Sequence, residues 1–294
     1  MIYKIRHKTH YQYKNAVSVG SHAVYLTPRS SLHHRCVKNE ITVSPKPAAR
    51  SERVDYFGNI IKFFTIQEPH QDFELEAYSE VIVDGQKPVW PAAAPAWDEI
   101  AKGLPSDKSP SGLDAFQFVF ESPRVRPSAE FAAYAEPSFP KGRPVTEALL
   151  DFTARIYKEF KFDSKATTVS TTSEEVLHKR RGVCQDFAHL QVACLRSLGL
   201  PARYISGYLR TFPPPGKPRL VGADASHAWL SVYCPNFGWL DVDPTNNLIP
   251  SDGHVTLAWG RDYSDVAPVR GVILGGRDHK LEVAVDMEPV GSGS

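Results

Sequence analysis

The sequence predicts an α+β protein in which a β-rich N-terminal unit precedes a mixed unit of helices and strands. Apolar and polar residues alternate along most of region 1–86, whereas helix-like periodicity begins at Val145 and gives way to further strand-like segments near residue 200. A length of 294 residues exceeds what one hydrophobic core usually supports. Two packed units are therefore expected.

Region 1–86 is expected to form a β-rich N-terminal domain with a sandwich-like or barrel-like shape. Asp55 to Asn59 and Asp84-Gly85 supply turn signals between its strands. The strand-like segments are Tyr3–Tyr13, Glu40–Val43, Ile60–Ile66, Phe73–Ala77 and Val81–Val83. Several short strands at this spacing are typical of a small antiparallel sandwich or barrel.

Region 87–144 is expected to hold a linker and short helices. Lys87 to Pro110 is rich in proline, alanine and tryptophan, which indicates a linker or a loop packed across the surface. Ser128 to Ala135 is a short helix candidate.

Region 145–250 is expected to be the core that carries the chemistry. A first helix over Val145–Phe160 begins after Pro144, at a position that proline favours. A capping box at Thr172 and Glu175 predicts a second helix over Ser173–Lys179. A third helix runs from Cys184 to Leu198 and ends at Gly199.

Strands dominate the remainder of the chain. The predicted strands are Arg203–Arg210, His227–Tyr233 and Gly238–Val242, and region 251–294 adds strands that pack on the core or on the N-terminal domain. Phe212 to Lys217 is expected to form a stiff proline-rich loop that borders a cleft.

Composition excludes several classes of partner. The 34 basic and 33 acidic side chains leave a net charge of +1, which predicts neither nucleic acid nor a membrane surface as partner. The first residues contain no apolar stretch like that of a signal peptide, which predicts a cytoplasmic protein. The four cysteines form no C-x-x-C pair, so no metal site is expected. Oligomeric state is not determined by these observations.

Cys184 is the candidate nucleophile. A thiol attacks as its thiolate, and the unpaired N–H groups of a helix's first turn favour a negative charge there. Gly182 permits a tight turn just before it, and Gln185 and Asp186 are polar where a buried helix start would be apolar. Cys36, Cys194 and Cys234 are interpreted as packed thiols.

His227 and Asp243 are the candidate base and its orienting group. The turn sequence Cys234 to Gly238 predicts an antiparallel hairpin that places both residues at its open end. Their side chains lie on the same face of the hairpin only if the connecting loop has an odd number of residues or a β-bulge shifts one strand by one residue. Asp241 has the same parity and remains the alternative, although Pro244 favours Asp243 by ending the strand there.

Three segments closely resemble the core of the transglutaminase-like superfamily. They are Gly182–His189 (Gly-Val-Cys-Gln-Asp-Phe-Ala-His), His227–Trp229 (His-Ala-Trp) and Gly238–Asn246 (Gly-Trp-Leu-Asp-Val-Asp-Pro-Thr-Asn). Tyr11–Tyr13 and Leu26–Arg29 resemble the β-rich N-terminal region of a bacterial subgroup, and His254–Tyr263 resembles its C-terminal segment.

The resemblance implies a papain-like core with a triad of Cys184, His227 and Asp243. It implies a cysteine peptidase, or a transferase acting on glutamine amides: the thiolate attacks an amide of a peptide or protein to give a thioester, which water or an amine resolves. No cofactor is expected. Trp229, Tyr208 and Tyr263 are candidate substrate-binding residues, and the alternative function is a catalytically inactive binding module.

Overall fold

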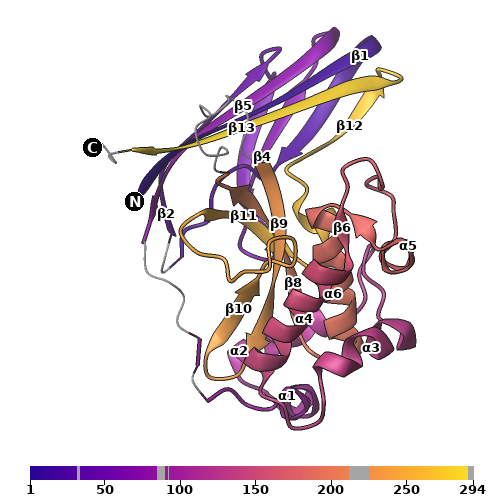
Figure 1. Cartoon of the computed structure of the whole chain (residues 1–294). Coiled ribbons are helices and arrows are strands. Elements are labelled where there is room, and N and C mark those ends of the chain that lie inside the picture. The colour runs from indigo at the N-terminus through magenta and orange to yellow at the C-terminus, as the bar shows by residue number, and fades with distance from the viewer. Residues whose placement is uncertain (32–33, 85–89, 92, 212–224, 291–294) are drawn as a thin grey trace, which may run out of the picture.

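A computed structural model describes residues 1–31, 34–84, 90–91, 93–211 and 225–290 (Figure 1). The chain forms a curled antiparallel sheet that leans over a second sheet, and the second sheet carries helices on its far side. The curled sheet has seven strands: β1 (Ile2–Val24), β2 (His34–Ser44), β3 (Ala49–Val54), β4 (Ile60–Ile66), β5 (His70–Val83), β12 (Val269–Gly275) and β13 (His279–Val290).

Strand β1 organises the curled sheet because four other strands pair with it. Along one edge, Ile2 lies opposite Ile82 of β5 and Gly20 lies opposite Ile66 of β4. Along the other edge, β13 and β12 pair with the same two halves of β1. The β-rich N-terminal region is thus confirmed, but it is a single curled sheet, completed by strands from the C-terminal part of the chain.

Alternation along β1 explains how this sheet meets the core. Tyr3, Ile5 and His7 are buried, whereas the intervening Lys4 and Arg6 are exposed. The buried face of the sheet packs on residues of the second sheet, including Tyr208 and Val255. Because side chains alternate between the two faces of a strand, one pattern supplies both the contact surface and the solvent face.

The second sheet is the centre of the core. Its strand order is β10 (Gly238–Val242), β9 (Ala225–Cys234), β8 (Ala202–Leu209) and β11 (His254–Gly260). The helices are α1 (Trp97–Gly103), α2 (Pro110–Phe116), α3 (Ala129–Ala135), α4 (Val145–Glu159), α5 (Ser173–Lys179), α6 (Cys184–Ser197) and α7 (Tyr263–Val266). A short parallel pair, β6 (Lys161–Phe162) and β7 (Arg181–Gly182), lies just before α6.

Helix α6 is the central helix and positions the candidate nucleophile. It packs between α3, α4 and α5 and the sheet strands β8 and β9, and its residues from Asp186 to Arg196 are all buried. Gly199, with a φ of 79°, ends it in the left-handed conformation that suits glycine. Helices α4, α5 and α6 begin at the predicted residues and end at or within one residue of the predicted ends.

Three elements differ from the sequence-based expectations. Helix α1 lies inside the stretch that was interpreted as a linker, and strand β3 was not predicted. Strands were expected in region 251–294, but the position of β11 within it was not predicted. The proposed loop at residues 212–217 and the turn residue Gly85 lie outside the described residues. In the part of the chain that the structure describes, no helix is long and apolar enough to cross a membrane.

Candidate active site

Cys184 is the first residue of α6, and the Asp186 side chain fixes the backbone just before it. The Asp186 carboxylate accepts hydrogen bonds from the Val183 backbone N–H (2.8 Å) and from the Thr167 hydroxyl (2.6 Å). A Cβ at Gly182 would lie 2.7 Å from the same carboxylate, so only glycine allows this close approach. The Cys184 side chain is a half-buried free thiol.

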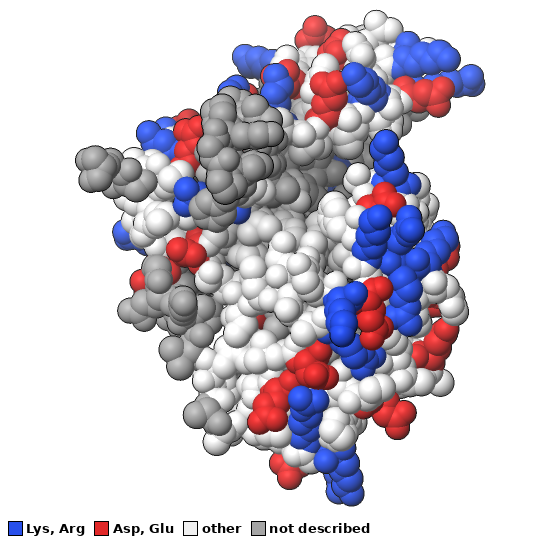
Figure 2. Space-filling view, in the orientation of Figure 1, with Lys and Arg blue, Asp and Glu red and all other residues white. Residues whose placement is uncertain are grey.

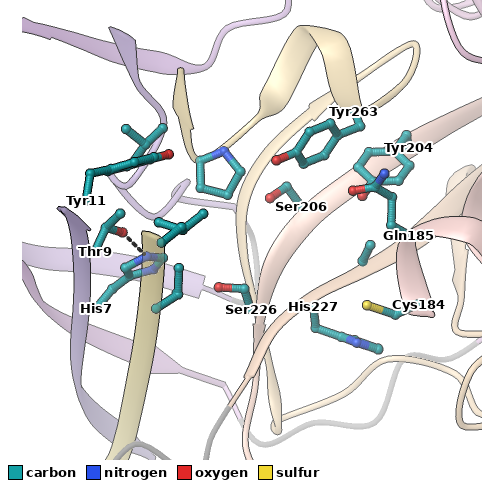
Figure 3. Close-up of a pocket in the computed structure, with 15 residues that line it drawn as sticks. His7, Thr9, Tyr11, Cys184, Gln185, Tyr204, Ser206, Ser226, His227 and Tyr263 are labelled. Carbon is teal, nitrogen blue, oxygen red and sulfur yellow. Dashed lines mark hydrogen bonds between the residues drawn. The ribbon is translucent and has the colours of Figure 1, made fainter. Parts of the chain in front are cut away.

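His227 joins the cysteine to an aspartate. Its Nε2 lies 2.7 Å from Asp243 Oδ2, and Cys184 is close enough to the ring to raise its pKa. Because Nε2 is used by Asp243, Nδ1 is the ring nitrogen left for the sulfur. Figure 3 shows the sulfur beside the His227 ring. The structure therefore brings all three predicted triad residues together.

The hairpin explains why His227 and Asp243 meet. Gly238 pairs with Cys234, so the turn between β9 and β10 contains three residues, 235–237. An odd loop length puts residues 227 and 243 on the same face, as the sequence required. Asn236 adopts a φ of 64° in that turn, a conformation that asparagine tolerates better than most residues. The predicted hairpin is confirmed.

Asp241, the alternative partner of His227, forms its hydrogen bonds with other side chains. It accepts hydrogen bonds from Trp229 Nε1 (3.1 Å) and from the Ser231 hydroxyl. Trp229 thus stands between Asp241 and the histidine, whose ring it stacks on at 6.1 Å. Asp243 is the carboxylate in contact with His227.

Asp243 is fully buried and surrounded by donors, two of which the sequence reasoning missed. Its Oδ2 also accepts from Asn246 Nδ2 (2.7 Å) and faces His254 Nε2 (3.2 Å), and its Oδ1 accepts from the Thr245 backbone N–H (2.9 Å). Burial alone would raise the pKa of this carboxyl, but the hydrogen bonds from His227, His254 and Asn246 hold it well below its usual value. Asn246 ends the third motif of the sequence and could have been noticed there.

The charge of Asp243 determines the state of His227. Burial lowers the pKa of His227, but the hydrogen bonds and charges of Asp243 and Cys184 outweigh it and raise that pKa from 6.5 to about 10. The imidazole is therefore protonated at neutral pH. A protonated imidazole beside the sulfur stabilises the thiolate form that acts as a nucleophile.

A pocket of about 260 Å³ opens beside Cys184 and His227. The core contributes Gln185, Tyr204 and Tyr263, and the curled sheet contributes the opposite wall (Figure 3). That wall includes His7, Thr9 and Tyr11 of β1, Val269 of β12, and Leu281 and Val283 of β13. The N-terminal region is thus part of the site, which the sequence did not indicate.

The three candidate substrate-binding residues occupy different places. Tyr263 lines the pocket beside Cys184. Trp229 and Tyr208 are each only 1% exposed and do not line it. Trp229 packs behind the triad, and the Tyr208 hydroxyl lies 3.1 Å from His7 Nδ1 inside the contact between the two sheets. Buried packing against these neighbours accounts for both side chains.

Other titratable groups near α6 do not compete with Cys184. His189 is buried and accepts a hydrogen bond from the Tyr263 backbone N–H, and burial lowers its pKa to about 3. Burial raises the pKa of the Cys194 thiol far above its usual value. Ring and carboxylate atoms of His227, Asp243 and His254 lie within 4.8 Å of one another, but hydrogen bonding to Asp243 accounts for this cluster.

Comparison with known proteins places the chain in a family. Residues 3–82 match the bacterial transglutaminase-like N-terminal region, and residues 132–244 match the transglutaminase-like superfamily. An uncharacterized protein of Mycobacterium tuberculosis is 41% identical over 292 residues, which cover 98% of this chain and 92% of that protein. The chain belongs to the transglutaminase-like superfamily.

Two further proteins are similar to this transglutaminase-like chain. A protein-glutamine gamma-glutamyltransferase of Pseudomonas aeruginosa is 35% identical over 86 residues, covering 29% of this chain and 13% of that protein. The crystal structure of a proposed cysteine protease from Cytophaga hutchinsonii superposes with a TM-score of 0.76 at 22% identity, covering 100% of this chain and 92% of that one. The family and the fold class predicted from the sequence are thus confirmed.

Proposed function

We propose that this protein catalyses cysteine-dependent acyl transfer on peptide or protein amides. The observation that carries the proposal is the position of His227, which contacts the Cys184 thiol on one side and the buried Asp243 carboxylate on the other. A nucleophile, a base and an orienting carboxylate in this order form the arrangement that activates a thiol for attack on a carbonyl.

In the proposed reaction the Cys184 thiolate attacks the carbonyl carbon of an amide. The carbonyl oxygen becomes an oxyanion, and the backbone N–H of Cys184 at the start of α6 is proposed as one of its donors. His227 then gives its proton to the leaving nitrogen, which departs as ammonia or an amine and leaves a thioester on Cys184. Water or an amine, deprotonated by His227, attacks the thioester and releases the product and the thiolate.

The surroundings of Cys184 support a peptide or protein substrate. The pocket is open to solvent, and its wall from the curled sheet is largely apolar where Leu281 and Val283 line it. On the face drawn in Figure 2, basic and acidic side chains are interspersed over the helices. The described residues that line the pocket at Cys184 include no lysine, arginine, aspartate or glutamate. An uncharged binding surface suits a polypeptide segment better than a highly charged ligand.

The first experiment measures the reactivity of the thiol. Iodoacetamide at pH 7 should label Cys184 at least about 100-fold faster than Cys36, which is also half-buried and serves as an internal control. His227→Gln should slow only the labelling of Cys184. Equal labelling rates at the two cysteines would contradict an activated thiol.

The second experiment identifies the acceptor. Peptide pools incubated with the wild type and with Cys184→Ala are compared by mass spectrometry. Loss of about 17 Da on coupling to an amine indicates transamidation, a gain of about 1 Da indicates deamidation, and new termini indicate proteolysis. No Cys184-dependent change in any pool, despite fast labelling of Cys184, would favour the alternative of an inactive binding module.

A further inference from the structure

A second pocket lies behind the triad, on the opposite face of the core sheet from α6. It encloses about 460 Å³ and shares no lining residue with the pocket at Cys184. Indole rings dominate it, because Trp90, Trp229, Trp239 and Trp259 all line it. A largely apolar cavity of this size with a few polar groups is the usual form of a small-molecule site.

Arg203 of β8 is the polar group at the centre of this pocket. Its guanidinium lies 4.2 Å from the ring centre of Trp239 and 3.8 Å from that of Trp259, so the two indoles enclose it. The residue is 8% exposed, and its Nε has no hydrogen-bond partner. Among the described residues it also forms no ion pair.

The charge on Arg203 is therefore only partly compensated within the chain. Burial lowers the pKa of Arg203 to about 9, and the largest opposing influence is the charge of Asp241. The Asp241 carboxylate accepts its hydrogen bonds from Trp229 and Ser231 and forms none with the Arg203 guanidinium. Burying a protonated guanidinium without a hydrogen-bond acceptor carries a desolvation penalty. A ligand that supplies an acceptor offsets this penalty, which makes its binding more favourable.

The geometry restricts the chemistry of such a ligand. A guanidinium presents its N–H groups in one plane, which matches the two oxygens of a carboxylate. The indole rings, together with Ile205, Ile249 and Pro250, supply the apolar surface of the cavity, and Arg29, Asp84 and Asp241 also line it. The complement of this site is a small molecule with an apolar or aromatic body and one carboxylate.

His254 connects this pocket to the triad. Its Nε2 faces Asp243 Oδ2 at 3.2 Å, whereas its Nδ1 is buried without a partner and the residue lines the second pocket. Its ring also packs edge-on against Trp229, 5.1 Å away. A ligand in the pocket would therefore contact two side chains that themselves contact the triad.

We propose that this pocket is a second binding site, separate from the Cys184 pocket, for small apolar carboxylates, with Arg203 as the anchor. The site lies against the triad through His254 and Trp229, so occupancy is expected to alter the reactivity of Cys184. The proposal concerns binding and does not depend on the acyl-transfer reaction.

Intrinsic fluorescence provides the assay, because four of the five tryptophans line the pocket. Phenylacetate is titrated against phenylacetamide, a neutral analogue of the same shape. We expect saturable quenching by phenylacetate with a Kd at least about tenfold lower than that of the amide. Equal affinities, or no saturable change with either compound, would overturn the proposal.

Two variants and one modified protein locate the binding. Arg203→Gln should abolish the preference for phenylacetate, whereas Arg53→Gln, which removes an exposed arginine stacked on Phe63, should retain it. If Arg203→Gln does not fold, Arg203→Lys replaces it and should weaken phenylacetate binding by at least about tenfold, because lysine lacks the planar fork. Phenylacetate binding should remain saturable after Cys184 is alkylated; loss of that binding on alkylation would place it in the other pocket and refute the proposal.

Discussion

Replacing Asp243 by asparagine tests how the triad activates Cys184. The Asp243 carboxylate makes the largest contribution against the burial of His227, whose pKa it and Cys184 together raise to about 10. Without that carboxylate, the pKa of His227 should fall. The sulfur then loses the cation that stabilises a thiolate beside it.

The expected magnitude follows from the charge of His227. In the wild type, His227 keeps its proton throughout pH 6 to 9, so a cation lies beside the sulfur over that whole range. In Asp243→Asn that cation is lost as the pKa of His227 falls. Alkylation of Cys184 by iodoacetamide at pH 7 should therefore slow by about 100-fold or more.

Asp241→Asn is the matched control for this experiment. It removes the same charge two residues earlier on the same face, but from a carboxylate that bonds Trp229 and Ser231 rather than His227. Its rate of Cys184 alkylation at pH 7 should stay within about threefold of the wild-type rate. A wild-type rate in Asp243→Asn would refute the argument that Asp243 sets the charge of His227.

Three further predictions concern stability and the pocket wall. The raised pKa of His227 adds at most about 5 kcal/mol to the free energy of unfolding below about pH 6.5, and this contribution is lost as the pH rises through about 10. The free energy of urea unfolding should therefore fall more between pH 7 and pH 10.5 in the wild type than in His227→Gln. Equal falls in the two proteins would contradict the prediction. Gly207→Ala would place a Cβ 2.4 Å from both Trp229 and the Val255 carbonyl, so it should destabilise by about 1–3 kcal/mol in urea, whereas Gly253→Ala, which meets nothing within 4 Å, should not. Because Leu281 lines the pocket, Cys184 should react several-fold faster with N-benzyl-iodoacetamide than with iodoacetamide, and Leu281→Asp should remove this preference. The melting temperature should not change, because Leu281 is 47% exposed. An unchanged preference would show that this wall does not contact ligands.

Local chemistry made much of the site predictable from the sequence. Cys184 begins a helix because the chain turns at Gly182 and an apolar stripe follows, and both features are visible in the residues themselves. The His227–Asp243 contact was predictable for a related reason. Loop length and strand parity determine which side chains share a face of a hairpin, so the pairing follows from counting residues.

Residues brought in by distant strands could not be predicted in this way. His254 reaches Asp243 because β11 joins the core sheet beside β8, on the opposite side from β9, an arrangement that no local pattern encodes. The pocket wall from β1 and β13 likewise depends on the packing of one sheet against another. Helix α1 was missed because its seven residues bury only Ile100, so it shows no apolar stripe.

The pairing of Ile2 with Val290 has a consequence for how the protein is made. Strand β1 cannot form this pairing until β13 has been synthesised, and contacts of such long sequence separation form slowly. At about 5–20 residues per second, translation needs roughly 15–60 s to deliver that partner after β1 leaves the ribosome. During this interval one edge of β1 lacks its partner, and unpaired edges are prone to aggregation. The pocket at Cys184 gains the β13 part of its wall, Leu281 and Val283, only after β13 has been synthesised.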